Sequence, residues 1–259
     1  PSQNNVEACA KHKKGKGDTE LVQTPTEAPK TEIKTTEAPT EDPAITAARQ
    51  QALPLDPNVK HGTLSNGLQY FIRKNSKPEN RMEMRLIVNA GSIQEDEDQK
   101  GLAHFLEHMA FNGSKNFDKN ELVNYVESIG VKFGPHLNAY TSFDETVYML
   151  QVPTDQPEIL EKGLLILEDW ASGLSLSVEE INKERGVVVS EWRSSLGPQQ
   201  RMQYQYFPVL LKDSRYPDRL PIGDTAIINN ASQEVVKRFY TDWYRPDLMA
   251  VVLVGDFDV

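Results

Sequence analysis

Hydrophobic positions follow two different periods along this chain, and the changes between them divide it into elements. Short segments that alternate or run apolar predict β-strands, and longer segments with apolar residues three and four apart predict amphipathic helices. The predicted strands cover residues 68–73, 82–89, 138–142, 145–152 and 248–254. The predicted helices cover residues 100–111, 120–129, 157–173, 177–196 and 235–244. The last strand is expected to be buried because its apolar run is unbroken.

Turn and capping residues mark several boundaries of these elements. Asn66-Gly67 predicts a hairpin turn within residues 64–68, because both residues readily adopt positive φ. Ser177, followed by an acidic first turn, predicts the N-cap of the helix at 177–196, and Gly197-Pro198 predicts its end. Two strands, two helices, two strands, several helices and a final strand predict an α+β fold. We expect helices packed on one face of a mostly antiparallel sheet.

The first 56 residues differ in composition from the rest of the chain. They are rich in Thr, Glu, Lys, Ala and Pro, the segment Thr-Glu-Ala-Pro occurs at 26–29 and again at 36–39, and the first aromatic residue is Tyr70. A segment without large apolar side chains cannot offset the entropy that ordering would cost. Residues 1–56 are therefore expected to be a disordered tail or linker, and residues 57–259 are enough for one domain with its own core.

Charge and cysteine content narrow the classes of function. The net charge is −10 and no basic stripe occurs, which disfavours nucleic-acid binding. No apolar run approaches the length that spans a bilayer. Cys9 is the single cysteine, so an intrachain disulfide is excluded. Its setting, Val6-Glu7-Ala8-Cys9 before a polar tether, faintly resembles a bacterial lipoprotein processing site. A lipid anchor at Cys9 and an incidental cysteine both remain open.

The segment GLAHFLEHMAFNG carries the candidate chemistry. His104 and His108 are four residues apart on a predicted helix, so both imidazoles project from one face and can bind one Zn²⁺. Glu107 shares that face and can reach a water molecule on the metal. This His-x-x-Glu-His order is the inverse of the more common zinc-peptidase motif.

Two glutamates in INKERGVVVSEW supply a candidate third ligand. Glu184 and Glu191 are seven residues apart, about two helical turns, and therefore lie nearly on one helix face. One carboxylate would complete a His₂Glu set that leaves a fourth position open, which is the pattern of catalytic zinc sites. The other carboxylate would fix a histidine tautomer through its ring N–H. Spacing alone does not decide which glutamate has which role.

Taken in order, four stretches resemble the pitrilysin/insulinase family of zinc peptidases. They are GLAHFLEHMAFNGSKNF, HLNAYTSFDETVYML, NKERGVVVSEW and MAVVLVGDFD, and the resemblance covers roughly residues 62–259. It implies the α+β fold of the mitochondrial processing peptidase and insulinase-type domain. It also implies that residues 57–259 are a zinc-peptidase catalytic domain, the N-terminal part of a longer chain, with one Zn²⁺ per chain.

The resemblance assigns roles to the candidate residues. His104 and His108 match the zinc histidines, and Glu107 matches the general base. Glu191 matches the glutamate ligand, and Glu184 matches the glutamate that supports a histidine. Counting the family's usual gap from His108 ends near Glu184 instead, but the Glu-x₆-Glu pattern places the ligand second, and the intervening segment is interpreted as longer here.

The implied activity is hydrolysis of extended peptides by a zinc-dependent endopeptidase. The substrate would add a strand to the sheet edge at residues 136–142, where Asn138 and Ala139 match the family's Asn-Ala and Tyr140 follows. Further homologous domains after Val259 or in a partner chain would complete the site, so this segment is expected to be weakly active or inactive alone.

A bacterial periplasmic or envelope location is expected. The alternative is a catalytically silent scaffold or assembly subunit, since the family includes members with degraded motifs.

Two further polar features are interpreted without a chemical role. His136 is expected in a loop or at the start of a strand, because it belongs to neither zinc-site helix. The acidic run from Glu95 to Asp98 is expected to be a solvated loop before the helix of the zinc histidines, where negative charge suits a helix N-terminus.

Overall fold

The computed structural model describes residues 49, 51 and 54–258. Residues from Pro54 onward form one compact unit. The predicted tail at 1–56 lies almost entirely outside the described residues, and so does Cys9, so the predictions made for them stay untested. Among the helices of the described part, none has both the length and the apolar character needed to cross a bilayer.

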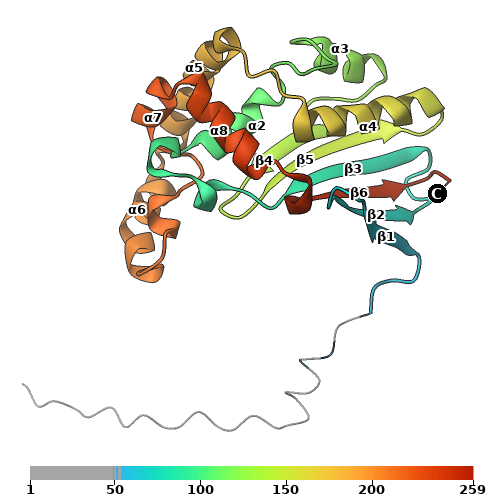
Figure 1. Ribbon diagram of the computed structural model, residues 1–259, viewed down its shortest axis with the longest axis horizontal. Helices are drawn as coiled ribbons and strands as arrows, with labels where there is room; N and C mark the ends of the chain where they lie inside the picture. Colours follow the sequence, from blue (N-terminus) through green and yellow to red (C-terminus); the bar gives the residue numbers. More distant parts are fainter. Residues whose placement is uncertain (1–48, 50, 52–53, 259) are drawn as a thin grey trace, which may run out of the picture. The chain divides into compact units, whose positions relative to one another are not determined.

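A six-stranded sheet with the order β1-β2-β6-β3-β5-β4 forms one layer of this unit (Figure 1). The strands are β1 (Val59–Thr63), β2 (Gln69–Lys74), β3 (Arg81–Val88), β4 (Leu137–Thr141), β5 (Thr146–Pro153) and β6 (Met249–Gly255). All neighbouring strands pair antiparallel except β2 and β6, which are parallel. The mostly antiparallel sheet is as predicted, and β4 lies at one edge of it.

Helices form the second layer, and α2, α4, α5 and α8 lie over the same face of the sheet (Figure 1). The α-helices are α2 (Leu102–Met109), α3 (Glu121–Ser128), α4 (Pro157–Ser172), α5 (Val178–Ser195), α6 (Pro198–Leu210), α7 (Thr225–Asn230) and α8 (Gln233–Trp243). Short 3₁₀ helices are η1 (Ser92–Gln94), η2 (Glu97–Gln99), η3 (Tyr216–Asp218) and η4 (Pro246–Leu248). The α+β class predicted from the hydrophobic pattern is confirmed.

The alternation of β3 shows why the helices cover one face. Met82, Met84, Leu86 and Val88 are buried, whereas the residues between them are half-buried or exposed. Successive side chains of a strand point to opposite faces, so this period of two directs one apolar face toward the helices.

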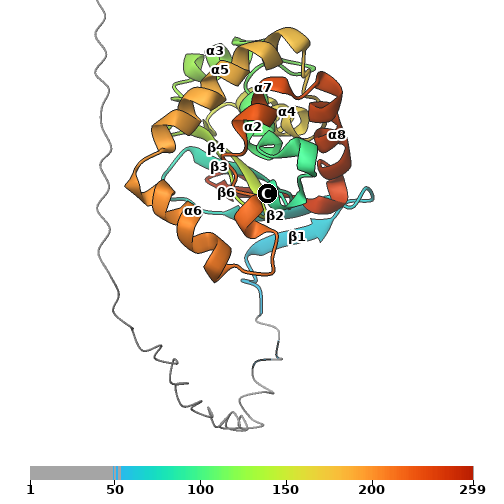
Figure 2. The ribbon, with the colours of Figure 1, turned by 90° about the vertical axis from the view of Figure 1, so that its left-hand side faces the viewer.

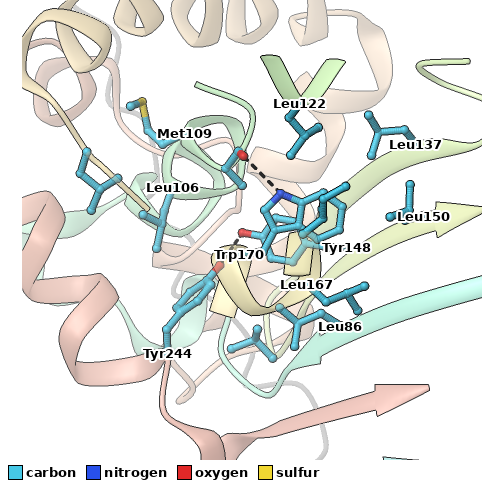
Figure 3. Close-up of a cluster of buried hydrophobic side chains, with 14 of the residues drawn as sticks. Leu86, Leu106, Met109, Leu122, Leu137, Tyr148, Leu150, Leu167, Trp170 and Tyr244 are labelled. Carbon is cyan, nitrogen blue, oxygen red and sulfur yellow. Dashed lines mark hydrogen bonds between the residues drawn. The ribbon is translucent and has the colours of Figure 1, made fainter. Parts of the chain in front are cut away.

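Helix α2 lies in the middle of the helical layer, with α5, α7 and α8 around it (Figure 2). Phe105, Leu106 and Met109 of α2 are fully buried. Beside them Trp170 of α4 stacks on Tyr148 of β5, with ring centroids 5.2 Å apart (Figure 3). The short helix that carries the His-x-x-Glu-His motif is therefore set in the hydrophobic core rather than on the surface.

Helices α6 and α7 were not predicted from the sequence. Gly197-Pro198 does end α5, which stops at Ser195, but Pro198 also starts α6, because proline suits the first helical position. None of the residues of α6 is buried, and Val209 is 78% exposed, so the helix has no core-facing stripe for a periodicity argument to detect.

The prediction that β6 is buried is only partly right. The strand pairs on both sides, with β2 and β3, but the residues between its two ends are only half-buried. Helix α4 leaves part of the strand uncovered. An apolar groove of about 430 Å³ remains there, and its lining includes Leu68, Leu164 and Val251.

Candidate metal centre

Three ligand-type side chains from α2 and α5 converge on one point. The Nε2 atoms of His104 and His108 are 3.2 Å apart. Glu191 places Oε2 3.6 Å from Nε2 of His104 and 3.3 Å from Nε2 of His108. Ligands of a tetrahedral zinc ion at roughly 2.0–2.1 Å are separated from one another by about 3.3 Å. The three residues therefore form a group whose spacing fits one zinc ion.

The environment of His104 favours its neutral form. Burial, reinforced by the charge of His108, lowers the pKa of His104 to about 4. A neutral imidazole is the form that binds a metal ion. A cation would bind Nε2 of His104, Nε2 of His108 and Oε2 of Glu191 together. A single proton could be shared by only two of these three atoms. Nδ1 of His104 is buried and has no hydrogen-bond partner among the described residues.

Glu184 supports His108 from the side away from Glu191. Nδ1 of His108 donates to Oε1 of Glu184 at 2.8 Å, and Nδ2 of Asn112 donates to the other carboxylate oxygen at 2.9 Å. This arrangement leaves the Nε2 lone pair of His108 directed toward Glu191 and His104. Burial alone would raise the pKa of Glu184, but the hydrogen bonds from His108 and Asn112 outweigh it and lower the pKa.

Glu107 lies beside these residues and is only 7% exposed. Oγ1 of Thr141, in β4, donates to Oε2 of Glu107 at 2.9 Å. Burial raises the pKa of Glu107, and the Thr141 hydrogen bond opposes the rise. A carboxyl group whose pKa is raised is suited to take a proton and to return it.

A pocket of about 580 Å³ opens at this point between α2, α5 and the edge strand β4. Asn138, Ala139 and Tyr140 line it from β4, and the two polar side chains among them are exposed. An apolar wall from three other segments completes the lining, formed by Phe111, Phe133 and Val187. His136 lies in the loop before β4, as expected, where its Nδ1 accepts from the backbone N–H of Lys132 at 3.2 Å.

Helix α5 is held by tertiary contacts where its own sequence is weak. Oγ of Ser177 accepts from the backbone N–H of Glu180, which confirms the predicted N-cap. Gly186 and the three valines after it have low helix propensity. Next to them Arg185 donates to the backbone carbonyls of Ile228 and Ala231, at the end of α7. These bonds stabilise the part of α5 that lies between Glu184 and Glu191.

Asn112 and Thr141 contact the candidate residues but were not singled out from the sequence. Asn112 is four residues after His108, and this helical spacing could have revealed it. Thr141 offered no such signal, because its contact with Glu107 depends on where β4 passes beneath α2.

The interpretation of residues 95–98 as a solvated loop is wrong for Glu95. Its side chain is fully buried, and its carboxyl group accepts from the backbone N–H groups of Gly101 at 3.0 Å and Ala103 at 2.9 Å. Burial raises the pKa of Glu95 to about 8, while these N–H groups and the charge of Arg219 oppose the rise. The loop is drawn inward because Arg215 and Arg219 both donate to the backbone carbonyl of Glu95.

The sequence matches one known family and is similar to named relatives. The family model described as "Insulinase (Peptidase family M16)" matches residues 70–207. A relative from Haemophilus influenzae, "Probable zinc protease PqqL", is 46% identical over 206 residues, covering 80% of this chain and 22% of the relative. A "Zinc protease PQQL-like" protein of Arabidopsis thaliana is 44% identical, covering 76% of this chain and 21% of the relative.

A solved structure agrees with the fold. The first half of the periplasmic protease PqqL from Escherichia coli superposes with a TM-score of 0.77 at 38% identity, covering 80% of this chain and 44% of that one. The chain thus spans about a fifth of the length of the full-length relatives that it matches.

Proposed function

The chain belongs to the insulinase family, peptidase family M16, and we propose that it carries the zinc site of a metalloendopeptidase that cleaves extended peptides. The observation that supports this most strongly is the convergence of His104, His108 and Glu191 beside the buried carboxyl group of Glu107. The printed names of the relatives from Haemophilus influenzae and Arabidopsis thaliana, both zinc proteases, agree with this proposal.

In this proposal each residue of the site has one task. His104, His108 and Glu191 hold one zinc ion, and Glu184 keeps His108 in the tautomer that presents Nε2. When bound there, zinc would supply Lewis acidity, which activates water and polarises a carbonyl group. Glu107 accepts the proton of the attacking water at its carboxylate and returns it to the leaving amine.

We propose that the edge strand β4 holds the substrate. Its free edge borders the pocket, and Asn138, Ala139 and Tyr140 lie along it. An extended peptide can pair with such an edge through backbone hydrogen bonds, which bind with little dependence on sequence. The apolar wall that includes Phe111 and Phe133 favours an apolar side chain next to the cleaved bond.

The complete protein is proposed to be larger and periplasmic. The described domain corresponds to 44% of the first half of the Escherichia coli relative, which supports further domains in the complete protein. That relative is a periplasmic protease, and its 38% identity over 80% of this chain supports the same compartment.

Hydrolysis of an internally quenched peptide tests the proposed activity. Because this segment is expected to be weakly active or inactive alone, the assay uses the complete protein that carries it. We expect fluorescence to rise, to stop rising when a zinc chelator is added, and to rise again when zinc is restored. His108→Ala should abolish the signal, whereas His61→Ala, which removes an exposed histidine of β1, should leave it unchanged. Hydrolysis that persists in the chelator or in His108→Ala would contradict the proposal.

A further inference from the structure

The first turn of α2 is capped by the side chain of Glu95 rather than by its own N-cap residue. Gly101 occupies the N-cap position with φ +97°, and it has no side chain to cap the helix. The backbone N–H groups at the start of a helix have no partner within the helix. The carboxyl group of Glu95 accepts from two of them, those of Gly101 and Ala103, and so replaces the missing cap.

Glu95 is itself held in place by hydrogen bonds from two arginines to its backbone carbonyl. Arg215 donates through Nη2 to the Glu95 carbonyl at 2.7 Å, and Arg219 donates through Nε at 3.0 Å. Arg219 is only 3% exposed, and its own carbonyl accepts from Oγ of Ser92 at 2.5 Å. The segment that contains η3 therefore fixes the loop that caps α2.

The C-terminal end of α2 is held by a different residue. Nε1 of Trp170 donates to the carbonyl of Ala110 at 3.2 Å, and the indole lies in the core (Figure 3). A helix of eight residues with both ends fixed has little freedom to slide or rotate. His104 follows Ala103 directly, so the position of its ring depends on the turn that Glu95 caps.

We propose that Glu95 is a positioning residue of the metal centre, which sets the place of His104 relative to Glu191 by anchoring the first turn of α2. This inference rests on the proposed zinc site. Glu191 belongs to α5, whereas the hydrogen bonds of the Glu95 carboxyl group go to the start of α2, so a shift of the first turn of α2 would change the distance between the two ligands. A metal site tolerates displacements of only about 0.5 Å before its geometry is lost.

Metal affinity of Glu95→Gln tests this inference. The amide keeps the size of the side chain but offers one acceptor oxygen, and it turns an NH₂ group toward the second backbone N–H. The measurement is made above the Glu95 pKa of about 8, where both oxygens of the ionised carboxylate can accept hydrogen bonds. We expect zinc affinity, measured in the 259-residue chain by competition with a chromophoric chelator, to fall about 10–100-fold, as for other residues that orient ligands. The visible absorption spectrum of bound Co²⁺ should change as well, because it reports the geometry of the ligands.

Asp169→Asn is the matched control. Asp169 is a carboxyl group 1% exposed that accepts hydrogen bonds from Ser114 and Asn116, away from the first turn of α2. We expect it to lower the unfolding temperature while leaving zinc affinity and the Co²⁺ spectrum as in the wild type. Folded Glu95→Gln with wild-type zinc affinity and an unchanged Co²⁺ spectrum would overturn the inference.

A second variant covers the case in which Glu95→Gln does not fold. Arg219→Lys keeps the positive charge, but a single ammonium group cannot donate both to the Glu95 carbonyl and to the Glu97 carboxylate as the guanidinium does. We expect this variant to lower zinc affinity about 10-fold, the smaller end of the loss expected for Glu95→Gln. Wild-type affinity in folded Arg219→Lys would then overturn the inference. Failure of the wild-type chain to bind zinc would instead overturn the proposed function, so the two failures are distinguishable.

Discussion

Replacing each of the two α5 glutamates by alanine should separate their roles by the size of the loss in zinc affinity. Glu184→Ala removes the acceptor of two hydrogen bonds, from His108 at 2.8 Å and from Asn112 at 2.9 Å, but leaves the convergent group intact. Loss of such a supporting group costs about 10–100-fold in metal affinity, which corresponds to about 1.4–2.7 kcal/mol. Glu191→Ala removes one of three side-chain ligands, so we expect its loss to exceed that range.

The assay is a zinc titration against a chromophoric chelator, carried out at one pH for all variants. Glu179→Ala serves as the control, because Glu179 is on the same helix but its side chain is 75% exposed and pairs with Lys183. We expect the control to bind zinc as the wild type does. A larger loss for Glu184→Ala than for Glu191→Ala would refute the assignment and exchange the two roles.

Three further predictions follow from the buried groups around α2. Glu107→Gln should keep one equivalent of zinc but lower the rate of peptide hydrolysis about 10²–10⁴-fold, because the amide cannot accept a proton; activity within a few-fold of wild type would contradict the role of Glu107. Glu95 has a pKa of about 8 in the folded chain against 4.5 when unperturbed, so the folded state binds its proton more tightly. The difference in the free energy of unfolding in urea between the wild type and Glu95→Gln should therefore fall by a few kcal/mol as pH rises from 4.5 to 8, because this comparison cancels the titration of the other groups; a difference independent of pH would contradict it. Trp170→Phe should lower the free energy of unfolding by about 2–3 kcal/mol, because it opens a cavity and leaves the Ala110 carbonyl without its donor; a urea midpoint unchanged from wild type would contradict this.

Local periodicity was enough to predict most of the elements around the site. Strand β3 alternates without interruption, and α5 carries a capping serine at its start, so each has a signal within its own sequence. Helix α6 lacked such a signal because it buries none of its residues, and the six-residue α7 is too short for periodicity to stand out. Packing against α5 stabilises α7, where Ile228 is buried, whereas the local signal for α6 is the proline at its first position.

The candidate ligands could also be predicted from the local sequence. His104, His108, Glu184 and Glu191 lie in pairs on single helices, where spacing alone indicates a shared face. That the two pairs meet depends on how α2 and α5 pack, and sequence spacing does not contain this information.

The acidic run shows the limit of local interpretation most clearly. Glu95 resembles its acidic neighbours in sequence, yet it is buried, because Arg215 and Arg219 bind its backbone from more than a hundred residues away. The neighbouring Asp96 remains 69% exposed. A contact of such long range decides burial, and composition within the run cannot predict it.

The central claim is that His104, His108 and Glu191 together hold one zinc ion, and metal analysis of the purified chain tests it most directly. Elemental analysis after dialysis against metal-free buffer, followed by titration with zinc, should show one zinc ion per wild-type chain. The double variant His104→Ala/His108→Ala should bind none, while remaining folded by circular dichroism. A wild-type chain that binds no zinc, or a double variant that still binds one equivalent, would contradict the claim.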